Sequence, residues 1–184
     1  MSARSSDRSG RRSSNVRPVE PVPASASRSV LVRWMGVTDT NTAGFVHGGT
    51  VMKLCDEVAG LAAIRHSHCR VVTAGMDRMT FLEPVEMGDL VTFRASVNAV
   101  WRTSMEVGVR VEAERPARGA VRHTSSAYFT MVALDAEGRP TGVPPLETEN
   151  AVDARREREA QTRRDNRLAE RADLMRAREA EHEA

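Results

Sequence analysis

The chain has 184 residues, 40% of them hydrophobic and 4% aromatic, so it can form one domain of ordinary size around a core of Val, Leu, Met and Ala. Its 27 basic and 25 acidic side chains give a formal net charge of +2, which argues against a polyanionic partner for the whole chain, nucleic acid included. Two cysteines do not make a disulfide framework, and no apolar run is long enough to span a membrane. Prolines, not an apolar export segment, follow Arg11-Arg12, so we expect a cytoplasmic protein.

Residues 1–28 are rich in Ser, Arg and Pro and contain almost no large apolar side chains. Such a segment buries too little surface to offset the entropy lost on ordering, so we predict a disordered tail. Six arginines against two acidic residues leave open a weak contact between this tail and nucleic acid or another acidic surface.

A domain is predicted from Ser29 to residue 147. Residues 29–35 have the composition of a β-strand, and a loop with several glycines follows over residues 36–49. Residues 50–65 predict a helix of about 24 Å that is apolar on nearly all sides. Such a helix belongs inside the fold rather than on its surface.

Four predicted strands come after this helix, over residues 70–82, 90–101, 104–114 and 121–134. The segment 104–114 has the clearest pattern, because Met105, Val107, Val109 and Val111 alternate with polar or small residues. The order β-α-β-β-β-β predicts an α+β fold in which a long antiparallel sheet wraps around the central buried helix. The open edges of such a sheet would need covering, or pairing with a second copy.

Residues 148–184 form a highly charged C-terminal segment. Ten acidic residues and nine arginines lie between 149 and 184, with few large apolar residues among them. This composition predicts a helix, supported by ion pairs between residues four apart, or a solvated tail. Docking of the part around Leu168 and Leu174 on another subunit is the alternative.

Asp56 is the least expected residue of the apolar helix. The residues on its helix face, such as Met52, Ala59 and Gly60, offer a carboxylate no partner, whereas Glu57 has Lys53 four residues earlier. A carboxylate in apolar surroundings is costly unless it is paired or used in chemistry, so Asp56 is a candidate catalytic residue. The structural alternative is an ion pair with a distant arginine such as Arg78.

The loop before the helix offers polar groups at the helix start. Gly48-Gly49 would present free backbone amides at the positive end of the helix dipole, which suits an oxyanion. His47 could be a base, a substrate contact or a packing residue, and Asn41 and Asp39 by themselves indicate turns. A helix end that binds an oxyanion and an unexplained carboxylate together indicate hydrolysis of a carbonyl compound.

Two further polar clusters have both structural and functional interpretations. His66-Ser67-His68-Cys69 could bind a metal, but no second cluster completes a tetrahedral site, and histidine is favoured at a helix C-terminus in any case. Residues 101–104, Trp-Arg-Thr-Ser, interrupt two strands and are either a plain hairpin turn or a contact to phosphate or to the polar end of a ligand.

Four blocks in the same order as in a known family extend over about residues 30–147. The chain resembles acyl-CoA thioesterases of the hotdog fold, of the acyl-CoA hydrolase type. The blocks are Asn41 to Glu57 with His47-Gly48-Gly49 at its centre, Val71 to Asp89, Arg102 to Val107, and Tyr128 to Pro140. The chain departs from the family at Trp101, where glycine is usual.

The resemblance implies a hotdog fold and metal-independent hydrolysis of fatty acyl-CoA to free fatty acid and CoA, with coenzyme A present only in substrate and product. It assigns catalysis to Asn41 of one protomer and Asp56 of the other across a homodimer interface, with hexamers built from three such dimers as a usual assembly. We expect His47, Gly48 and Gly49 to bind the substrate carbonyl, and Thr73, on the strand over the helix, to help hold the water. Arg102, Thr103 and Ser104 would contact CoA.

Three alternatives remain open at this point. A hotdog hydratase or dehydratase acting on acyl thioesters would use the same fold with a different base. A non-catalytic acyl-CoA sensor would bind the ligand without releasing thiol. A nucleic-acid-associated protein would use the basic tail, and its binding would depend on salt.

Overall fold

The computed structural model describes residues 20–77 and 79–182 of the chain. The strands and helices within those residues, in chain order, are β1 (Val22–Pro23), the short 3₁₀ helix η1 (Ala24–Ser27), β2 (Ser29–Trp34), a second 3₁₀ turn η2 (Val37–Asp39), α1 (Gly48–Ser67), β3 (Arg70–Met76), β4 (Thr80–Phe81), β5 (Leu90–Val100), β6 (Ser104–Glu114), β7 (Val121–Leu134), β8 (Leu146–Glu147) and α2 (Ala151–His182).

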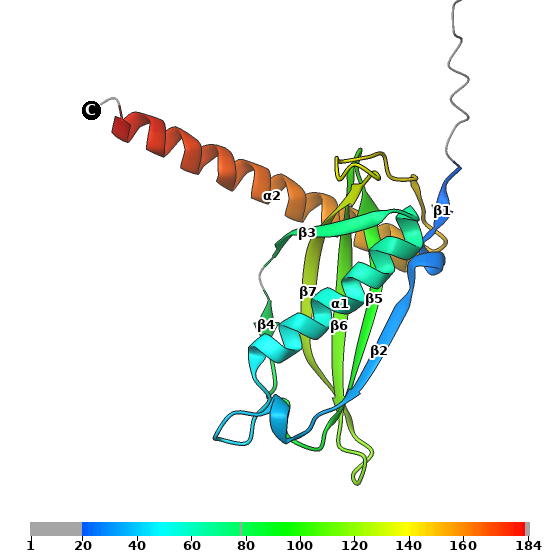
Figure 1. Cartoon of the computed structure of the whole chain (residues 1–184), viewed down its shortest axis with the longest axis vertical. Helices are drawn as coiled ribbons and strands as arrows, with labels where there is room; N and C mark the ends of the chain where they lie inside the picture. The colour runs from blue at the N-terminus through cyan, green and yellow to red at the C-terminus, as the bar shows by residue number, and fades with distance from the viewer. Residues whose placement is uncertain (1–19, 78, 183–184) are drawn as a thin grey trace, which may run out of the picture.

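A curved antiparallel sheet wraps around α1 (Figure 1). The strand order is β2-β5-β6-β7-β3, and β4 also pairs with β7. The β-α-β-β-β-β order and the central helix are therefore confirmed. The observed bounds of β6 and β7 are the predicted ones, because both strands alternate clearly between buried and less buried side chains.

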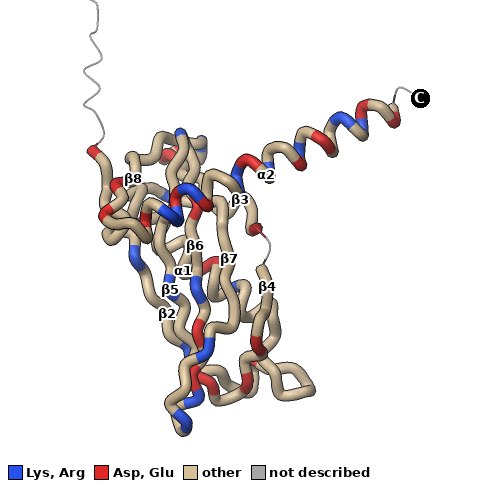
Figure 2. Tube along the Cα trace, turned by 180° about the vertical axis from the view of Figure 1, so that it is seen from behind, with Lys and Arg blue, Asp and Glu red and all other residues tan. Residues whose placement is uncertain are grey.

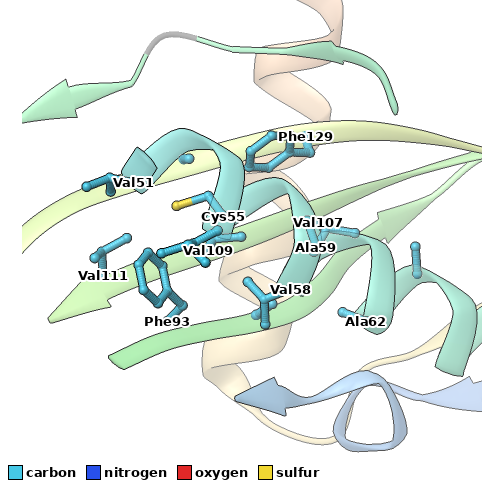
Figure 3. Close-up of a cluster of buried hydrophobic side chains, with 14 of the residues drawn as sticks. Val51, Cys55, Val58, Ala59, Ala62, Phe93, Val107, Val109, Val111 and Phe129 are labelled. Atoms are coloured by element: carbon cyan, nitrogen blue, oxygen red, sulfur yellow. The ribbon is translucent and has the colours of Figure 1, made fainter. Parts of the chain in front are cut away.

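The core lies between α1 and the inner face of the sheet (Figure 3). Small side chains on α1 let the helix lie close to the strands, which contribute the larger side chains. The residues in contact include Val51, Cys55, Val58, Ala59 and Ala62 of α1, Phe93 of β5, Val107, Val109 and Val111 of β6, and Phe129 of β7.

One predicted strand, 70–82, is wrong in its extent. It is divided into β3 and β4, which both pair with β7, and the pairing of β3 shifts its register between Thr73 and Gly75. The ladder continues after this bulge to Met76, which pairs with Phe129, and the amide of Asp77 donates to the carbonyl of Tyr128 at 2.8 Å. Arg78 lies outside the described residues.

The face of α1 that the sheet does not cover is more exposed than the sequence predicts. Leu61 and Ile64 are 51% and 45% exposed, so this face of the helix is not buried within the chain. Both side chains are large and apolar, and such side chains on one face of a helix are normally covered. The sequence pattern alone does not say whether the cover is the same chain or another.

The secondary structure begins earlier than the predicted boundary at Ser29. Val22 and Pro23 pair in parallel with Leu146 and Glu147 of β8. Ser27 is buried, and its hydroxyl oxygen accepts a hydrogen bond from the amide of Val97 at 2.9 Å. The predicted disorder is therefore wrong for residues 22–27, and its remaining part over residues 1–19 lies outside the described residues.

The predicted C-terminal helix is present as α2. Its first half crosses the outer face of the sheet, opposite α1, and its second half projects away from the domain (Figure 1). Every residue from 168 to 182 is exposed, Leu168 and Leu174 included. Among the described residues, no helix combines the length and apolarity needed to cross a membrane.

Candidate active site

Asp56 and Thr73 lie together where α1 meets β3. The Thr73 hydroxyl donates a hydrogen bond to Oδ1 of Asp56 at 2.5 Å, and its oxygen is 3.4 Å from the sulfur of Met131. The ladder explains this position, because Thr73 pairs with Met131 on β7 and so faces α1. Asp56 is only partly buried, and within the described part of the chain no arginine or lysine pairs with it. The alternative partner, Arg78, is outside that part.

Of the two residues beside Asp56 on α1, Glu57 has the partner that the sequence predicts, and Cys55 is buried. Glu57 forms an ion pair with Lys53 at 3.8 Å, so its charge has a partner on the same helix. Cys55 is fully buried, and burial, with a further contribution from the charge of Asp56, raises the pKa of its thiol to about 12. This thiol stays protonated at neutral pH and is not a nucleophile.

The start of α1 presents two backbone amides without an acceptor. The carbonyl of His47 accepts from the amides of Thr50 and Val51 at 3.0 and 3.2 Å. No described residue accepts from the amides of Gly48 and Gly49, which are the first two of the helix. These amides are available to an anion or a polarised carbonyl oxygen. A side chain at Gly48 would lie 3.3 Å from the ring of Phe81, so a larger residue fits poorly there.

Asn41 is held in the preceding loop by one end of its amide group. Its Oδ1 accepts from the amides of Ala43 and Phe45 at 2.9 and 3.1 Å. Two N–H donors on one atom identify that atom as the oxygen, so the orientation of the amide is fixed by its neighbours. The Nδ2 group has no acceptor among the described residues, and Asn41 is exposed.

Two other loop residues have different surroundings. Asp39 is buried and accepts from the amide of Gly36 at 2.8 Å, so it is the turn residue that the sequence indicates. The His47 side chain is exposed, and its backbone amide donates to the carbonyl of Asp39 at 2.9 Å.

The predicted CoA contact is far from the start of α1 within one chain. Ser104 pairs with Val132, whereas Phe81, which lies against Gly48, pairs with Ser125. Ser125 and Val132 are seven residues apart on β7, which corresponds to about 23 Å along a strand. The structure therefore does not bring Arg102, Thr103 and Ser104 together with Gly48 and Gly49.

Trp101 leaves the backbone of this turn undistorted. Among the described residues other than glycine, only His68 has a positive φ, so the turn needs no glycine at position 101. The Trp101 side chain instead contacts α2, donating from Nε1 to Oε1 of Gln161 at 3.0 Å. Sequence reasoning missed the contacts of α2 with this turn, because they follow no periodic pattern.

The cluster at the end of α1 consists of residues in separate surroundings. His66 is buried with Nε2 3.0 Å from the carbonyl oxygen of Pro144, and burial lowers the pKa of its ring despite that contact. His68 is exposed and ends the helix in a left-handed conformation. Within residues 20–77 and 79–182, no three His, Cys, Asp or Glu side chains are grouped so that they could hold a metal ion.

Residues 43–120 match the thioesterase superfamily. The cytosolic acyl coenzyme A thioester hydrolase of Mus musculus is 37% identical over 153 residues, which are 80% of this chain and 40% of that protein. The chain thus spans less than half the length of that mammalian relative. An uncharacterized acyl-CoA thioester hydrolase of Zymomonas mobilis is 37% identical over 139 residues, which are 73% of this chain and 88% of that protein.

Among solved structures, acyl-CoA hydrolases are likewise similar to this chain. The acyl-CoA hydrolase of Staphylococcus aureus, in complex with butyryl coenzyme A, coenzyme A and coenzyme A disulfide, is 32% identical with a TM-score of 0.79, covering 86% of this chain and 96% of that one. An apo-hexameric acyl-CoA thioesterase is 34% identical with a TM-score of 0.81, covering 84% of this chain and 99% of that one. These likenesses confirm the hotdog fold.

The Staphylococcus aureus hydrolase has also been solved with an asparagine, an aspartate or a threonine replaced by alanine. In that enzyme the asparagine precedes the aspartate by 15 positions, and the aspartate precedes the threonine by 17. Asn41, Asp56 and Thr73 have the same separations. By identity, coverage and fold, this chain belongs to the thioesterase superfamily, among its acyl-CoA thioester hydrolases.

Proposed function

We propose that this chain hydrolyses fatty acyl-CoA to a free fatty acid and coenzyme A. The observation that carries the proposal is the hydrogen bond between Thr73 and Asp56, at 2.5 Å, on a partly exposed part of α1. The matching separations of Asn41, Asp56 and Thr73 in the Staphylococcus aureus hydrolase support it.

Asp56 would act as the general base on water or as the nucleophile. The Thr73 hydroxyl holds Oδ1, which fixes the orientation of the carboxylate and leaves Oδ2 without a side-chain partner in the described chain. A base or nucleophile needs one such oxygen directed at the reacting atoms. Thr73 is therefore proposed as a positioning residue for Asp56.

Asn41 and the start of α1 would polarise the thioester carbonyl. The amides of Gly48 and Gly49 and the Nδ2 group of Asn41 are hydrogen-bond donors without an acceptor among the described residues. One donor to a developing oxyanion contributes about 2.7–4 kcal/mol to transition-state stabilisation. Because Oδ1 of Asn41 is already used in its loop, Asn41 acts in this proposal as a donor to the carbonyl rather than as an acceptor for water. His47, next to these amides, remains a proposed substrate contact.

These donors and the base of the same chain are too far apart to act on one carbon atom. Gly48 and Asp56 are eight residues apart on α1, which corresponds to about 12 Å along the helix axis. The donors would have to lie about 3 Å from the carbonyl oxygen while the carboxylate reaches the adjacent carbon directly or through one water molecule. We infer that Asn41, Gly48 and Gly49 of one protomer act together with Asp56 and Thr73 of a second copy.

The surface around Asp56 supports such a dimer. β3 pairs with β7 on one side and with no described strand on the other, so its free edge could pair with a second β3. Large apolar side chains are exposed nearby on α1, β3 and β4; they are Leu61, Ile64, Val72, Met76 and Phe81. An apolar surface of this kind marks an interface. The hexameric relative leads us to propose a trimer of such dimers.

Arg102, Thr103 and Ser104 are proposed to contact the CoA part of the substrate. The proposed hydrolysis uses only side chains and backbone amides of the protein. Coenzyme A takes part only as a portion of substrate and product.

The test is release of free thiol from acyl-CoA substrates of increasing chain length. We expect turnover by the wild-type protein and near-complete loss of kcat in Asp56→Asn, with an unchanged oligomer in gel filtration. Glu57→Gln removes a neighbouring charge that already has a partner, and should keep its activity. Full activity in folded Asp56→Asn would refute the proposed role of this residue.

A further inference from the structure

Helix α2 covers the turn formed by residues 101–104. Trp101 donates to Gln161 at 3.0 Å, and the guanidinium carbon of Arg164 lies 4.3 Å from the centre of the Trp101 ring. On β6, Ser104 is two residues before Glu106, whose side chain contacts α2 through Arg163, so Ser104 lies on the same outer face of the sheet. The predicted CoA contact is therefore beside α2, within the same chain.

Arg164 differs from the other partly buried arginines of α2. Acidic and basic residues alternate irregularly along this helix (Figure 2). Arg156 is 3.9 Å from Asp153, Arg163 is 2.7 Å from Glu106, and Arg167 is 2.5 Å from Asp77. Arg164 is also partly buried but has no carboxylate partner among the described residues. A guanidinium that has lost water without gaining an anion is poorly compensated.

The turn itself adds donors of the same kind. The Arg102 side chain is exposed and has no carboxylate partner in the described chain. The hydroxyls of Thr103 and Ser104 form no hydrogen bond with any described residue. The turn thus offers one guanidinium and two free hydroxyls, next in sequence to the Trp101 ring that carries Arg164, and phosphate oxygens accept well from donors of these kinds.

We propose that Arg164 of α2 binds a phosphate group of the CoA part of the substrate, together with Arg102 and the hydroxyls of the turn. Trp101 would hold Arg164 over the turn through the contact between its ring and the guanidinium. This assigns a role to the large side chain at position 101. The inference rests on the proposed function for its substrate, but it involves residues outside the proposed catalytic site.

The test compares two thioesters, of which only one carries the phosphates of coenzyme A together with its adenosine. Arg164→Gln is assayed with an acyl-CoA and with the same acyl group on pantetheine, which lacks all phosphates. We expect KM for the acyl-CoA to rise about tenfold or more, the effect of losing one charge-assisted hydrogen bond, with KM for acyl-pantetheine unchanged. Arg164→Lys, which keeps the charge, should recover part of the loss.

Arg158→Gln is the matched control. Arg158 is an exposed arginine of the same helix without a carboxylate partner among the described residues, and it lies six residues before Arg164. Its loss should leave both KM values unchanged. An equal effect of Arg164→Gln on the two thioesters would mean that Arg164 only anchors α2, and no effect on either would mean that it does not contact the substrate. Both results overturn the inference.

Binding of free coenzyme A, measured by calorimetry, separates this inference from the proposed activity. If the wild-type protein hydrolyses no thioester, the proposed function fails, but Arg164→Gln should still weaken coenzyme A binding at least tenfold and leave pantetheine binding unchanged. If thioesters are hydrolysed and coenzyme A binds equally to both proteins, only the inference on Arg164 fails.

Discussion

Thr73→Val tests the positioning of Asp56 by replacing the hydroxyl group of Thr73 with a methyl group. Valine has the shape of threonine but cannot donate to Oδ1 of Asp56, so the variant removes the 2.5 Å hydrogen bond and little else. A hydrogen bond to a charged group contributes about 1.5–3 kcal/mol. Thr73 is exposed in the single chain, so water competes with the bond and the lower end of that range applies. A loss of about 1.5 kcal/mol in the transition state lowers kcat slightly more than tenfold.

The assay is steady-state release of thiol from one acyl-CoA. We expect Thr73→Val to lower kcat by about this factor with KM nearly unchanged, because a carboxylate in the wrong orientation affects the reaction more than substrate binding. Thr73→Ser keeps the hydroxyl and should retain most of the activity. The free energy of unfolding should change by less than about 0.5 kcal/mol in both variants, as is usual for exposed positions.

Thr92→Val provides a matched control on β5. The Thr92 hydroxyl makes no hydrogen bond with any described residue, so the same chemical change there should leave kcat unaltered. If Thr73→Val keeps more than half of the wild-type kcat, or if Thr73→Ser loses as much as Thr73→Val, the hydrogen bond to Asp56 does not position the carboxylate and the reasoning is refuted.

Three further predictions concern stability. Glu106→Gln should lower the free energy of unfolding, measured by urea denaturation, by about 3 kcal/mol, because it breaks the ion pair of a fully buried carboxylate with Arg163. Glu112→Gln, which affects more exposed pairs, should cost less than about 1 kcal/mol. Burial lowers the pKa of His66, so below the ordinary value of 6.5 the unfolded chain binds more protons than the folded chain. The contribution of His66 to stability should be complete above that pH and should fall as pH drops through the lowered pKa. His66→Gln should remove this pH dependence, and His68→Gln should keep it. Burial tends to raise the pKa of Asp89, but a backbone amide and two arginines outweigh it and hold the pKa below its ordinary value of 3.8. The free energy of unfolding of the wild type should therefore fall as pH drops below about 4, and Asp89→Asn should be destabilised at neutral pH.

The central strands could be predicted because their burial alternates along the chain. In β6, every second residue from Met105 to Ala113 is buried against α1, and this period of two is visible in the sequence. The break after β3 could not be predicted in the same way. The end of β3 is set by its pairing with β7, a partner strand some 55 residues later.

The contacts of α2 and of residues 22–27 leave no such pattern. α2 lies on the sheet through ion pairs and through arginines over Tyr128 and Trp101, and a charged sequence alone predicts a solvated helix equally well. Residues 22–27 are held by distant partners: Ser27 accepts from Val97, 70 residues away, and Ser25 donates to Glu149 at 2.9 Å, 124 residues away. Short segments stabilised by distant residues have little signal of their own.

In the candidate site, too, some residues interact with partners close in sequence and others with distant partners. Asn41 and the glycines at the start of α1 lie near one another in sequence, and the hydrogen-bond partners of the Asn41 side chain, Ala43 and Phe45, are as close. The partner of Asp56 is 17 residues away on another element, and the exposed apolar side chains of Leu61 and Ile64 need a surface beyond the chain. An apolar side chain has the same sequence signal in a core and in an interface between copies.

The choice of threonine as the partner of Asp56 fits the proposed chemistry better than the arginine that sequence reasoning considered. An arginine could take both carboxylate oxygens at once through its paired N–H groups, which would leave no oxygen for a water molecule or a thioester carbon. A hydroxyl holds one oxygen and neutralises no charge. The neighbouring Cys55 thiol, kept protonated by burial, adds no second charge beside Asp56. The carboxylate is thus oriented but not neutralised, which is the state that a base or nucleophile requires.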